Sequence, residues 1–565
     1  MSLAAAIFAT PDPEQETVRA VDEILTGHAA IAIARLEAIV DGASSVLPRY
    51  WLSAAYGAVG DVERQRNALR RAQTDHSAQI IRDAGGDMAR LNNEPAYAEH
   101  VATQLYRANL MGAASLAFGL AGGERASQYA VLSYGLALQH QGRIDEAIRV
   151  FEFAAEAFPK AEVHAYLLYA CFFSENGVVR HAAEVRKAAQ AFGGAVAPAV
   201  SFTNARDANR RLRIGYVAPS FVGTQVRQYF LPVLEHHDPA KVEIFLYPAA
   251  IDKDAQLPAA KITAIGALSD ADACARIRAD KIDVLIDLWG HTAKGRLGVF
   301  ALRAAPVQAA WINYVQSTGI AAMDYVLHCD CMDAPGTPEL FTEKIWSLGP
   351  ILAPFRPDAL PDESPTPALK NGFITFGCFN HPAKINDAVV AAWSRILRAI
   401  PNSRLILKYS YYDDPVLQNT MCVRFAAHGV PPAQLEFRGH TKGPDYLKEF
   451  ADIDLALDPS PCPGGTTSSE AVASGVPLLV LRGEDFYARI SGVHVIPLGL
   501  DELLAETWDD YVARAVALTS DLQALDALRK RVRVAFAASP SRDEAGFTRG
   551  IESAFRAMFE TWANG

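Results

Sequence analysis

Residues 455–475 read LALDPSPCPGGTTSSEAVASG, and this stretch carries the clearest local signal in the sequence. A strand is expected to end near Asp458, a Pro-rich turn leads to Gly464 and Gly465, and a helix is expected to begin near Ser468. Glycines let backbone N–H groups approach a ligand closely, and the positive end of a helix attracts anions. The pattern is typical of a diphosphate site, although a capped helix without a ligand has the same spacing.

Polar side chains follow these glycines at the expected start of the helix. The hydroxyls of Thr466 and Thr467 can either cap the helix or bind phosphate. Glu470 lies one turn further along, where its carboxylate can accept hydrogen bonds from a ribose. This strand–turn–helix unit is therefore either a nucleotide site or a capped helix without a ligand.

A second stretch, GCFNHPAKINDAVVAAWSRIL (377–397), places a cation between a strand and a helix. The loop contains Asn380, His381 and Lys384, and Asn386 is the expected N-cap of the following helix. A lysine at this position can neutralise the charge that builds on a leaving nucleoside diphosphate. The alternative is an ordinary surface lysine on a loop.

A third stretch, DVLIDLWGHTAKGRLGVFALRAAPVQAAW (283–311), ends a strand on a carboxylate. Asp287 closes the strand and His291 follows in the next loop. Either group could orient or deprotonate an acceptor hydroxyl, so both are candidate catalytic residues. His291 could equally be a structural histidine.

Around these stretches, short apolar runs alternate with helical segments, which predicts an α/β fold with parallel sheets. The runs fall into two groups separated by the Pro-rich stretch 356–371. We predict two Rossmann-like domains, an acceptor-side domain over 211–355 and a donor-side domain over 371–565 that includes the final helix. Ligands of such sheets bind beyond the carboxyl ends of the strands, so two facing sheets would form a cleft.

Residues 1–193 have a different character: they are Ala-rich and show apolar residues at helical spacing. The segment 127–159 matches the 34-residue tetratricopeptide pattern, with Gly135 at a helix contact and Gly142 at a turn. Copies of it are expected at 164–192 and, in degenerate form, at 49–72. We predict a helical-repeat domain that binds a protein acceptor, the alternative being a spacer or a dimerisation arm.

The composition narrows the functional class. The net charge of −11 argues weakly against a nucleic-acid partner. No apolar run is long enough to span a bilayer, and the first residues do not resemble a signal peptide. The seven cysteines are scattered and odd in number, as is typical of reduced thiols. We expect a cytoplasmic protein with no membrane span.

Together these motifs resemble the O-linked N-acetylglucosamine transferase family, which includes Spindly-type transferases and bacterial relatives. The resemblance covers residues 127–560 and rests on LRIGYV (212–217), the stretch 283–311, FTEKIWSLG (341–349), FGCFNHPAKI (376–385) and 457–479. It implies tetratricopeptide repeats followed by a GT-B glycosyltransferase unit. The implied reaction inverts the sugar carbon without a metal or other cofactor and glycosylates Ser or Thr of a protein.

The resemblance also implies roles for individual residues. Lys384 would contact the donor diphosphate, Thr466 and Thr467 would bind phosphate, and Glu470 would hold the ribose. The predicted catalytic residues are Lys384, His291 and Asp287, and no metal ligands are predicted. The predicted donor-binding residues are Asn380, His381, Lys384, Thr441, Gly464, Gly465, Thr466, Thr467 and Glu470.

Several positions depart from the family pattern. Thr224 and Gln225 replace a His-Pro pair near the acceptor site, and YVQSTG (314–319) replaces the commoner Tyr-Pro-Gly-Thr-Ser-Gly. The default donor is UDP-N-acetylglucosamine, with GDP-fucose or a CMP-linked nonulosonic acid as alternatives. The acceptor could be flagellin, and the chain could form a homo-oligomer. A degenerate transferase that acts only as a repeat-based binding protein is the other alternative.

Overall fold

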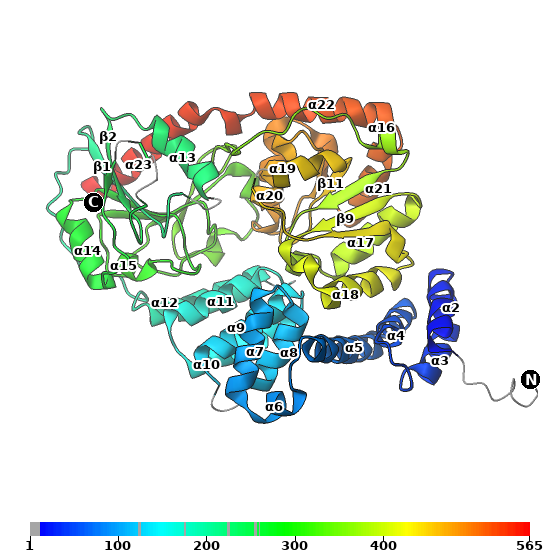
Figure 1. The fold of residues 1–565 in the computed structure, drawn as a ribbon. Coiled ribbons are helices and arrows are strands. Elements are labelled where there is room, and N and C mark those ends of the chain that lie inside the picture. The colour runs from blue at the N-terminus through cyan, green and yellow to red at the C-terminus, as the bar shows by residue number, and fades with distance from the viewer. Residues whose placement is uncertain are drawn as a thin grey trace, which may run out of the picture.

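The computed structural model of the chain describes residues 12–121, 126–174, 177–222, 226–252, 257–258, 260–443 and 445–565. Three parts follow one another along the chain: an all-helical region and two α/β units, as Figure 1 shows. The α/β units lie side by side, and the helical region runs beneath both of them in this view.

The helical region consists of antiparallel helix pairs, as the repeat pattern predicts. Gly135 is needed at a helix contact, because a Cβ there would lie 2.3 Å from the Phe151 ring. Gly142 has a positive φ at the turn between these two helices. The helices are α2 (Pro13–Leu25), α3 (Ala29–Ile39), α4 (Leu47–Ala58), α5 (Val62–Asp83), α6 (Met88–Asn93), α7 (Pro95–Arg107), α8 (Met111–Ala121), α9 (Gln128–His140), α10 (Ile144–Ala157), α11 (Ala161–Cys171) and α12 (Gly177–Ala191).

The first α/β unit contains a parallel seven-stranded sheet in the order β3-β2-β1-β4-β5-β6-β7. Its strands are β1 (Leu212–Val217), β2 (Val242–Tyr247), β3 (Lys261–Ile262), β4 (Val284–Asp287), β5 (Val307–Ala310), β6 (Tyr325–His328) and β7 (Lys344–Ser347). One face packs against α13 (Val226–His236), and the other packs against α14 (Asp270–Ala279) and α15 (Leu297–Ala301).

The second unit contains a parallel six-stranded sheet in the order β10-β9-β8-β11-β12-β13. Its strands are β8 (Thr375–Cys378), β9 (Arg404–Lys408), β10 (Leu435–Arg438), β11 (Leu455–Leu457), β12 (Leu478–Leu481) and β13 (Leu504–Ala505). Its helices are α16 (Ala368–Asn371), α17 (Asp387–Ala399), α18 (Pro415–Ala426), α19 (Asp445–Lys448), α20 (Thr466–Ala473), α21 (Trp508–Thr519) and α22 (Leu522–Ala538). Two parallel sheets in sequence confirm the predicted fold class.

The final helix, α23 (Glu544–Asn564), departs from the predicted domain plan. It returns to the first unit, where Ile551, Phe555 and Phe559 pack in the core beneath β1 and α13. Figure 1 shows its red ribbon beside α13, away from the second sheet. Assigning this helix to the second domain was therefore wrong, because its apolar face is buried by the first sheet.

The helical region packs against both α/β units. The Asp414 carboxylate, at the start of α18, accepts a hydrogen bond of 2.7 Å from the backbone N–H of Gly112 in α8. At the other end of the repeats, His181 of α12 is hydrogen-bonded to the Tyr314 hydroxyl of the first unit. The repeats are thereby held across the junction of the two units.

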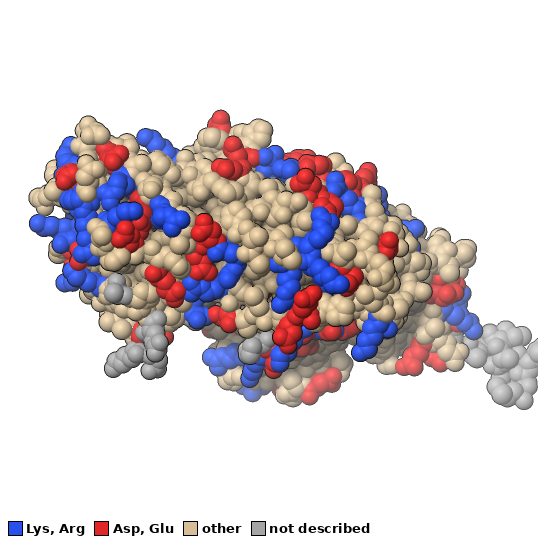
Figure 2. Space-filling model, turned by 90° about the horizontal axis from the view of Figure 1, so that it is seen from above, with Lys and Arg blue, Asp and Glu red and all other residues tan. Residues whose placement is uncertain are grey.

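Surface features agree with the composition. On the face drawn in Figure 2, Lys and Arg side chains are interspersed with Asp and Glu and do not gather in one basic patch. Over the described ranges, none of the helices combines the length and the apolar character that crossing a bilayer requires.

Candidate functional site

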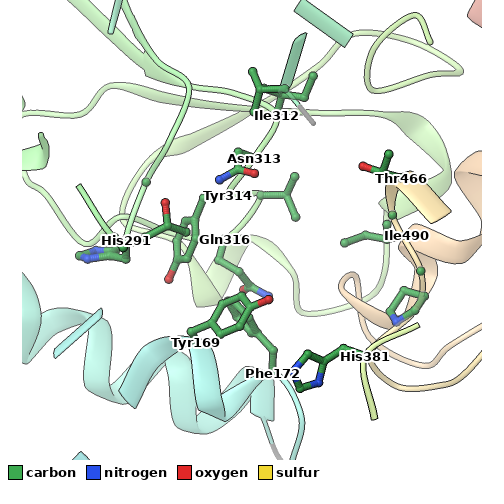
Figure 3. A pocket seen from close by; sticks show the side chains of 18 of the residues that line it. Tyr169, Phe172, His291, Ile312, Asn313, Tyr314, Gln316, His381, Thr466 and Ile490 are labelled. Atoms are coloured by element: carbon green, nitrogen blue, oxygen red, sulfur yellow. The ribbon is translucent and has the colours of Figure 1, made fainter. Parts of the chain in front are cut away.

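A cavity of about 1200 Å³ lies where the three parts of the chain meet. Its wall includes side chains of α9 and α11, the loops that follow β4 and β5, and the turn before α20. Figure 3 shows the labelled residues of all three parts surrounding it. Such a volume is slightly above the roughly 300–1,000 Å³ typical of small-molecule sites.

A buried carboxylate shapes the turn before α20. One oxygen of Asp458 accepts hydrogen bonds of 2.9 Å from the Gly464 N–H and from the Ser468 hydroxyl. Burial raises the pKa of Asp458 to about 6, and the nearby Lys384 lowers it. Gly464 has to be glycine here, because a Cβ would lie 1.9 Å from the Ser468 hydroxyl oxygen.

Helix α20 begins at Thr466 and directs its N-terminus at the cavity wall formed by Gly464, Gly465 and Thr466. The N–H groups of Ser468 and Ser469 bond to the Gly465 carbonyl, whereas those of Thr466 and Thr467 have no acceptor among the described residues. Free amides at a helix N-terminus form an anion site. The turn thus offers two backbone donors with no acceptor among the described residues at the place where the sequence predicts a diphosphate.

Lys384 lies beside this turn. Its Nζ donates hydrogen bonds to the Pro463 carbonyl oxygen at 2.6 Å and to the Asn380 side-chain oxygen at 3.2 Å. An ammonium group has three donors, so one N–H is left for a ligand. Lys384 lines the cavity, which places a cation and the α20 N-terminus on the same wall.

Asn380 and Thr467 stand behind this wall and are absent from the residues that line the cavity. The Thr467 hydroxyl donates to Asn380 Oδ1 at 3.0 Å, the oxygen that also holds Lys384. The predicted phosphate contact of the Thr467 hydroxyl is thus replaced by an internal bond. Asn380 and the Thr467 side chain position Lys384, and the backbone N–H of Thr467 remains free.

Glu470 is almost fully buried on α20, and its carboxylate lies close to the side chains of Tyr446 and Gln228, which lower its pKa. Burial raises the pKa of Glu470 to about 7. Thr441 lies elsewhere, in a cluster where Lys408 Nζ bonds to its hydroxyl at 2.7 Å and to Glu449 at 2.8 Å. Neither Glu470 nor Thr441 lines the cavity.

His381 forms part of the junction with the repeats. Its Nδ1 accepts the Ala383 N–H at 3.0 Å, so Nε2 carries the proton and donates to His140 Nδ1 at 2.9 Å. Burial lowers the pKa of His140 to about 3 and that of His381 well below its usual range. Both histidines line the cavity as neutral rings.

The two candidate bases differ in their surroundings. His291 lines the cavity, and its Nε2 donates to the Thr318 carbonyl at 2.7 Å, while its Nδ1 has no partner among the described residues. Burial lowers the pKa of His291 to about 4. Asp287 does not line the cavity, and its two oxygens accept the backbone N–H groups of Trp289 and Gly290. Asp287 shapes the loop that carries His291.

Other residues at the site lack a motif in the sequence. The Tyr229 hydroxyl of α13 donates to Ser469 Oγ at 3.1 Å, and Ser469 is bonded to His494 Nδ1 at 3.1 Å. His494 Nε2 in turn donates to the Gly464 carbonyl at 3.1 Å. These three hydrogen bonds connect the first α/β unit to the turn before α20 in the second unit. Thr224 and Gln225, which replace the His-Pro pair of the family pattern, lie outside the described residues.

Comparisons with known proteins agree with this architecture. The model of glycosyl transferase family 41 matches residues 164–348 and 366–550. The chain is 34% identical over 380 residues to a Hordeum vulgare protein named probable UDP-N-acetylglucosamine–peptide N-acetylglucosaminyltransferase SPINDLY, covering 65% of the chain and 40% of that protein. The Arabidopsis thaliana protein of the same name is 33% identical over 383 residues, covering 65% and 41%. The chain thus spans about 40% of the length of these curated relatives.

A solved structure shares nearly the whole fold. A mutant of the Thermobaculum terrenum O-GlcNAc transferase matches with a TM-score of 0.78 and 28% identity, over 92% of this chain and 99% of that one. The resemblance inferred from the motifs is confirmed. The two matched segments cover most of both α/β units and the last repeat, whereas the part of the cavity wall that α9 provides lies outside them. The chain belongs to glycosyl transferase family 41.

Proposed function

We propose that the chain transfers a sugar from a nucleoside diphosphate to a Ser or Thr hydroxyl of a protein. The observation that carries this proposal is the position of Lys384, whose Nζ lies 2.6 Å from the Pro463 carbonyl at the foot of α20. A cation and free helix amides on one wall stabilise a departing diphosphate. The names of the family relatives support the same reaction class.

In the proposed reaction the acceptor hydroxyl attacks the anomeric carbon as the bond to the diphosphate breaks. The electron pair of that bond goes to the diphosphate, whose charge Lys384 and α20 balance, so we propose inversion without a metal. Of the two candidate bases, His291 is the better placed to take the proton of the acceptor hydroxyl, because the residue lines the cavity and its Nδ1 has no partner among the described residues. The carboxylate of Asp287 is already occupied by backbone N–H groups.

The donor we propose is UDP-N-acetylglucosamine, which the names of the relatives support. GDP-fucose also carries a diphosphate and fits the same proposed site, which consists of Lys384 and the N-terminus of α20. A CMP-linked sugar would offer only one phosphate to it. Glu470 and Gln228 are proposed to face the ribose side, behind the cavity wall.

The acceptor is proposed to enter along the repeats. The cavity extends between α9 and α11, where Tyr129 and Tyr169 are exposed, so a polypeptide lying there would reach Lys384. We propose a protein acceptor, with flagellin as one candidate, in the cytoplasm, and no cofactor besides the nucleotide sugar. A homo-oligomer is compatible with this arrangement.

Thermal unfolding with UDP, GDP or CMP tests the proposal, because a ligand that binds only the native state raises the midpoint. We expect one nucleotide to raise it by several degrees at millimolar concentration. Intact-mass measurement of an acceptor after co-expression then identifies the sugar. The absence of a shift with all three nucleotides would leave a repeat-based binding protein as the function.

The matched variants are Lys384→Met and Lys442→Met, the second being an exposed lysine of the same unit. Lys384→Met should lower the rate of transfer by a factor of about 100 to 1000, the usual effect of removing one stabilising donor. Lys442→Met should leave the rate unchanged. Full activity of Lys384→Met would refute the assignment.

A further inference from the structure

Gln316 presents an unused hydrogen-bond donor to the cavity. Its side chain is only 2% exposed, and its Nε2 has no partner among the described residues. Gln316 lines the cavity, and Figure 3 shows its side chain directed inward between Tyr314 and Tyr169. A buried amide without a partner is costly, so a donor kept in this position points to a ligand acceptor.

The segment that carries Gln316 lies beside the proposed diphosphate site at Lys384 and the N-terminus of α20. Tyr314, two residues earlier, packs in one cluster with Ala383 and Cys462. These are the chain neighbours of Lys384 and of Pro463, whose carbonyl binds the lysine. The 312–316 segment therefore lies on the cavity wall near a group attached to a diphosphate held by Lys384.

The segment is held rigidly on both sides of Gln316. The Glu343 carboxylate accepts the Ser317 hydroxyl at 2.8 Å and the Thr318 N–H at 2.7 Å. On the other side, Ile312 has a φ of 78°, a conformation that a β-branched residue adopts only when its surroundings impose it. Strained backbone of this kind is concentrated at ligand sites. The backbone that carries Gln316 is thus held in place on both sides.

We propose that Gln316 determines donor specificity by donating a hydrogen bond from Nε2 to an oxygen of the transferred sugar. This rests on the proposed function. The sugar is a better hydrogen-bond partner for Gln316 than the acceptor polypeptide, because Gln316 is buried beside the proposed diphosphate site. The proposed acceptor path begins at the exposed Tyr129 of α9, which is 51% accessible.

The test compares two ligands that differ only in the sugar. Calorimetric titration measures the Kd of UDP and of UDP-N-acetylglucosamine for the full chain, for Gln316→Met and for Gln139→Met; GDP and GDP-fucose replace them if GDP gives the larger thermal shift. Methionine keeps the length of glutamine and removes the donor. Gln139 is the control, since it lines the repeat side of the cavity and its Oε1 is equally without a partner.

We expect Gln316→Met to weaken nucleotide-sugar binding about tenfold while the Kd of the free nucleoside diphosphate stays within twofold. Retained diphosphate binding shows that the variant is folded. The unfolding midpoint without ligand should rise by a degree or two, because the unpaired amide is gone. Gln139→Met should leave both constants unchanged.

Equal binding of the nucleotide sugar by the full chain and Gln316→Met would overturn the inference. An increase only in the KM for the acceptor would overturn it as well, because Gln316 would then face the polypeptide. If the unaltered chain binds UDP and its sugar but Gln316→Met behaves identically, the inference alone fails. If the unaltered chain binds no nucleotide, the proposed function fails and this inference with it.

Discussion

Gly464→Ala should separate the geometry of the phosphate turn from the stability of the fold. The new Cβ would lie 1.9 Å from Ser468 Oγ and 2.8 Å from Asp458 Oδ1, well inside the roughly 3.0 Å that Cβ contacts respect. Ser468 can rotate away only by giving up its 2.9 Å bond to Asp458. The turn must otherwise shift by about an ångström, which moves the amides of α20.

Gly464→Ala should therefore have two effects of different size, one on the stability of the fold and one on the rate of transfer. Losing one donor to a buried carboxylate costs about 1–3 kcal/mol, so the unfolding midpoint should fall by a few degrees. A shift of about 1 Å in a positioning element lowers kcat/KM by a factor of about 100. The second effect should dominate, because we propose that the turn contacts the diphosphate directly.

Steady-state transfer kinetics and calorimetric unfolding measure the two effects. Ser468→Ala is the matched variant, since it loses the same bond to Asp458 without any added atom. It should lower the midpoint to a similar degree and retain at least a fifth of the activity. The reasoning fails if Gly464→Ala keeps normal kcat/KM, or if Ser468→Ala loses as much activity as Gly464→Ala.

Glu470→Gln should gain stability relative to the unaltered chain as the pH rises from about 5 to 8: burial raises the pKa of Glu470 to about 7, so the native state loses stability as this carboxyl ionises. A pH series of unfolding midpoints checks this, and a constant difference between the two proteins would contradict it. Phe555→Ala, in the fully buried face of α23, should destabilise the chain by about 3–5 kcal/mol and raise hydrogen exchange first in β1 and α13. Exchange that rises instead in the second sheet would show that α23 belongs there.

Much of the fold could be predicted because buried parallel strands appear as short apolar runs. The runs at 212–218 and 404–409 became β1 and β9. Strand β7 (Lys344–Ser347) escaped notice because none of its residues is fully buried and it lacks such a run. The partner of α23 could not be predicted either, since an amphipathic helix fits any apolar sheet face.

The site was predictable where chemistry and topology agree. Lys384 and Pro463 are 79 positions apart, yet both follow the carboxyl ends of neighbouring strands, β8 and β11, where ligands of such sheets bind. Asp287 shows the opposite case. A carboxylate at a strand end suggested catalysis, but backbone N–H groups occupy it, and local hydrogen bonds of this kind leave no trace in a sequence. Tyr229 and His494 reach the turn only through tertiary packing.

The most direct test concerns the contact between Lys384 and the diphosphate. Titration of the nucleoside diphosphate that stabilises the chain most, and of the matching nucleoside, gives the affinity gained from the two phosphates. We expect a gain of at least 100-fold in the unaltered chain and in Lys442→Met, and a gain at least tenfold smaller in Lys384→Met. An undiminished gain in Lys384→Met would show that the diphosphate is held elsewhere.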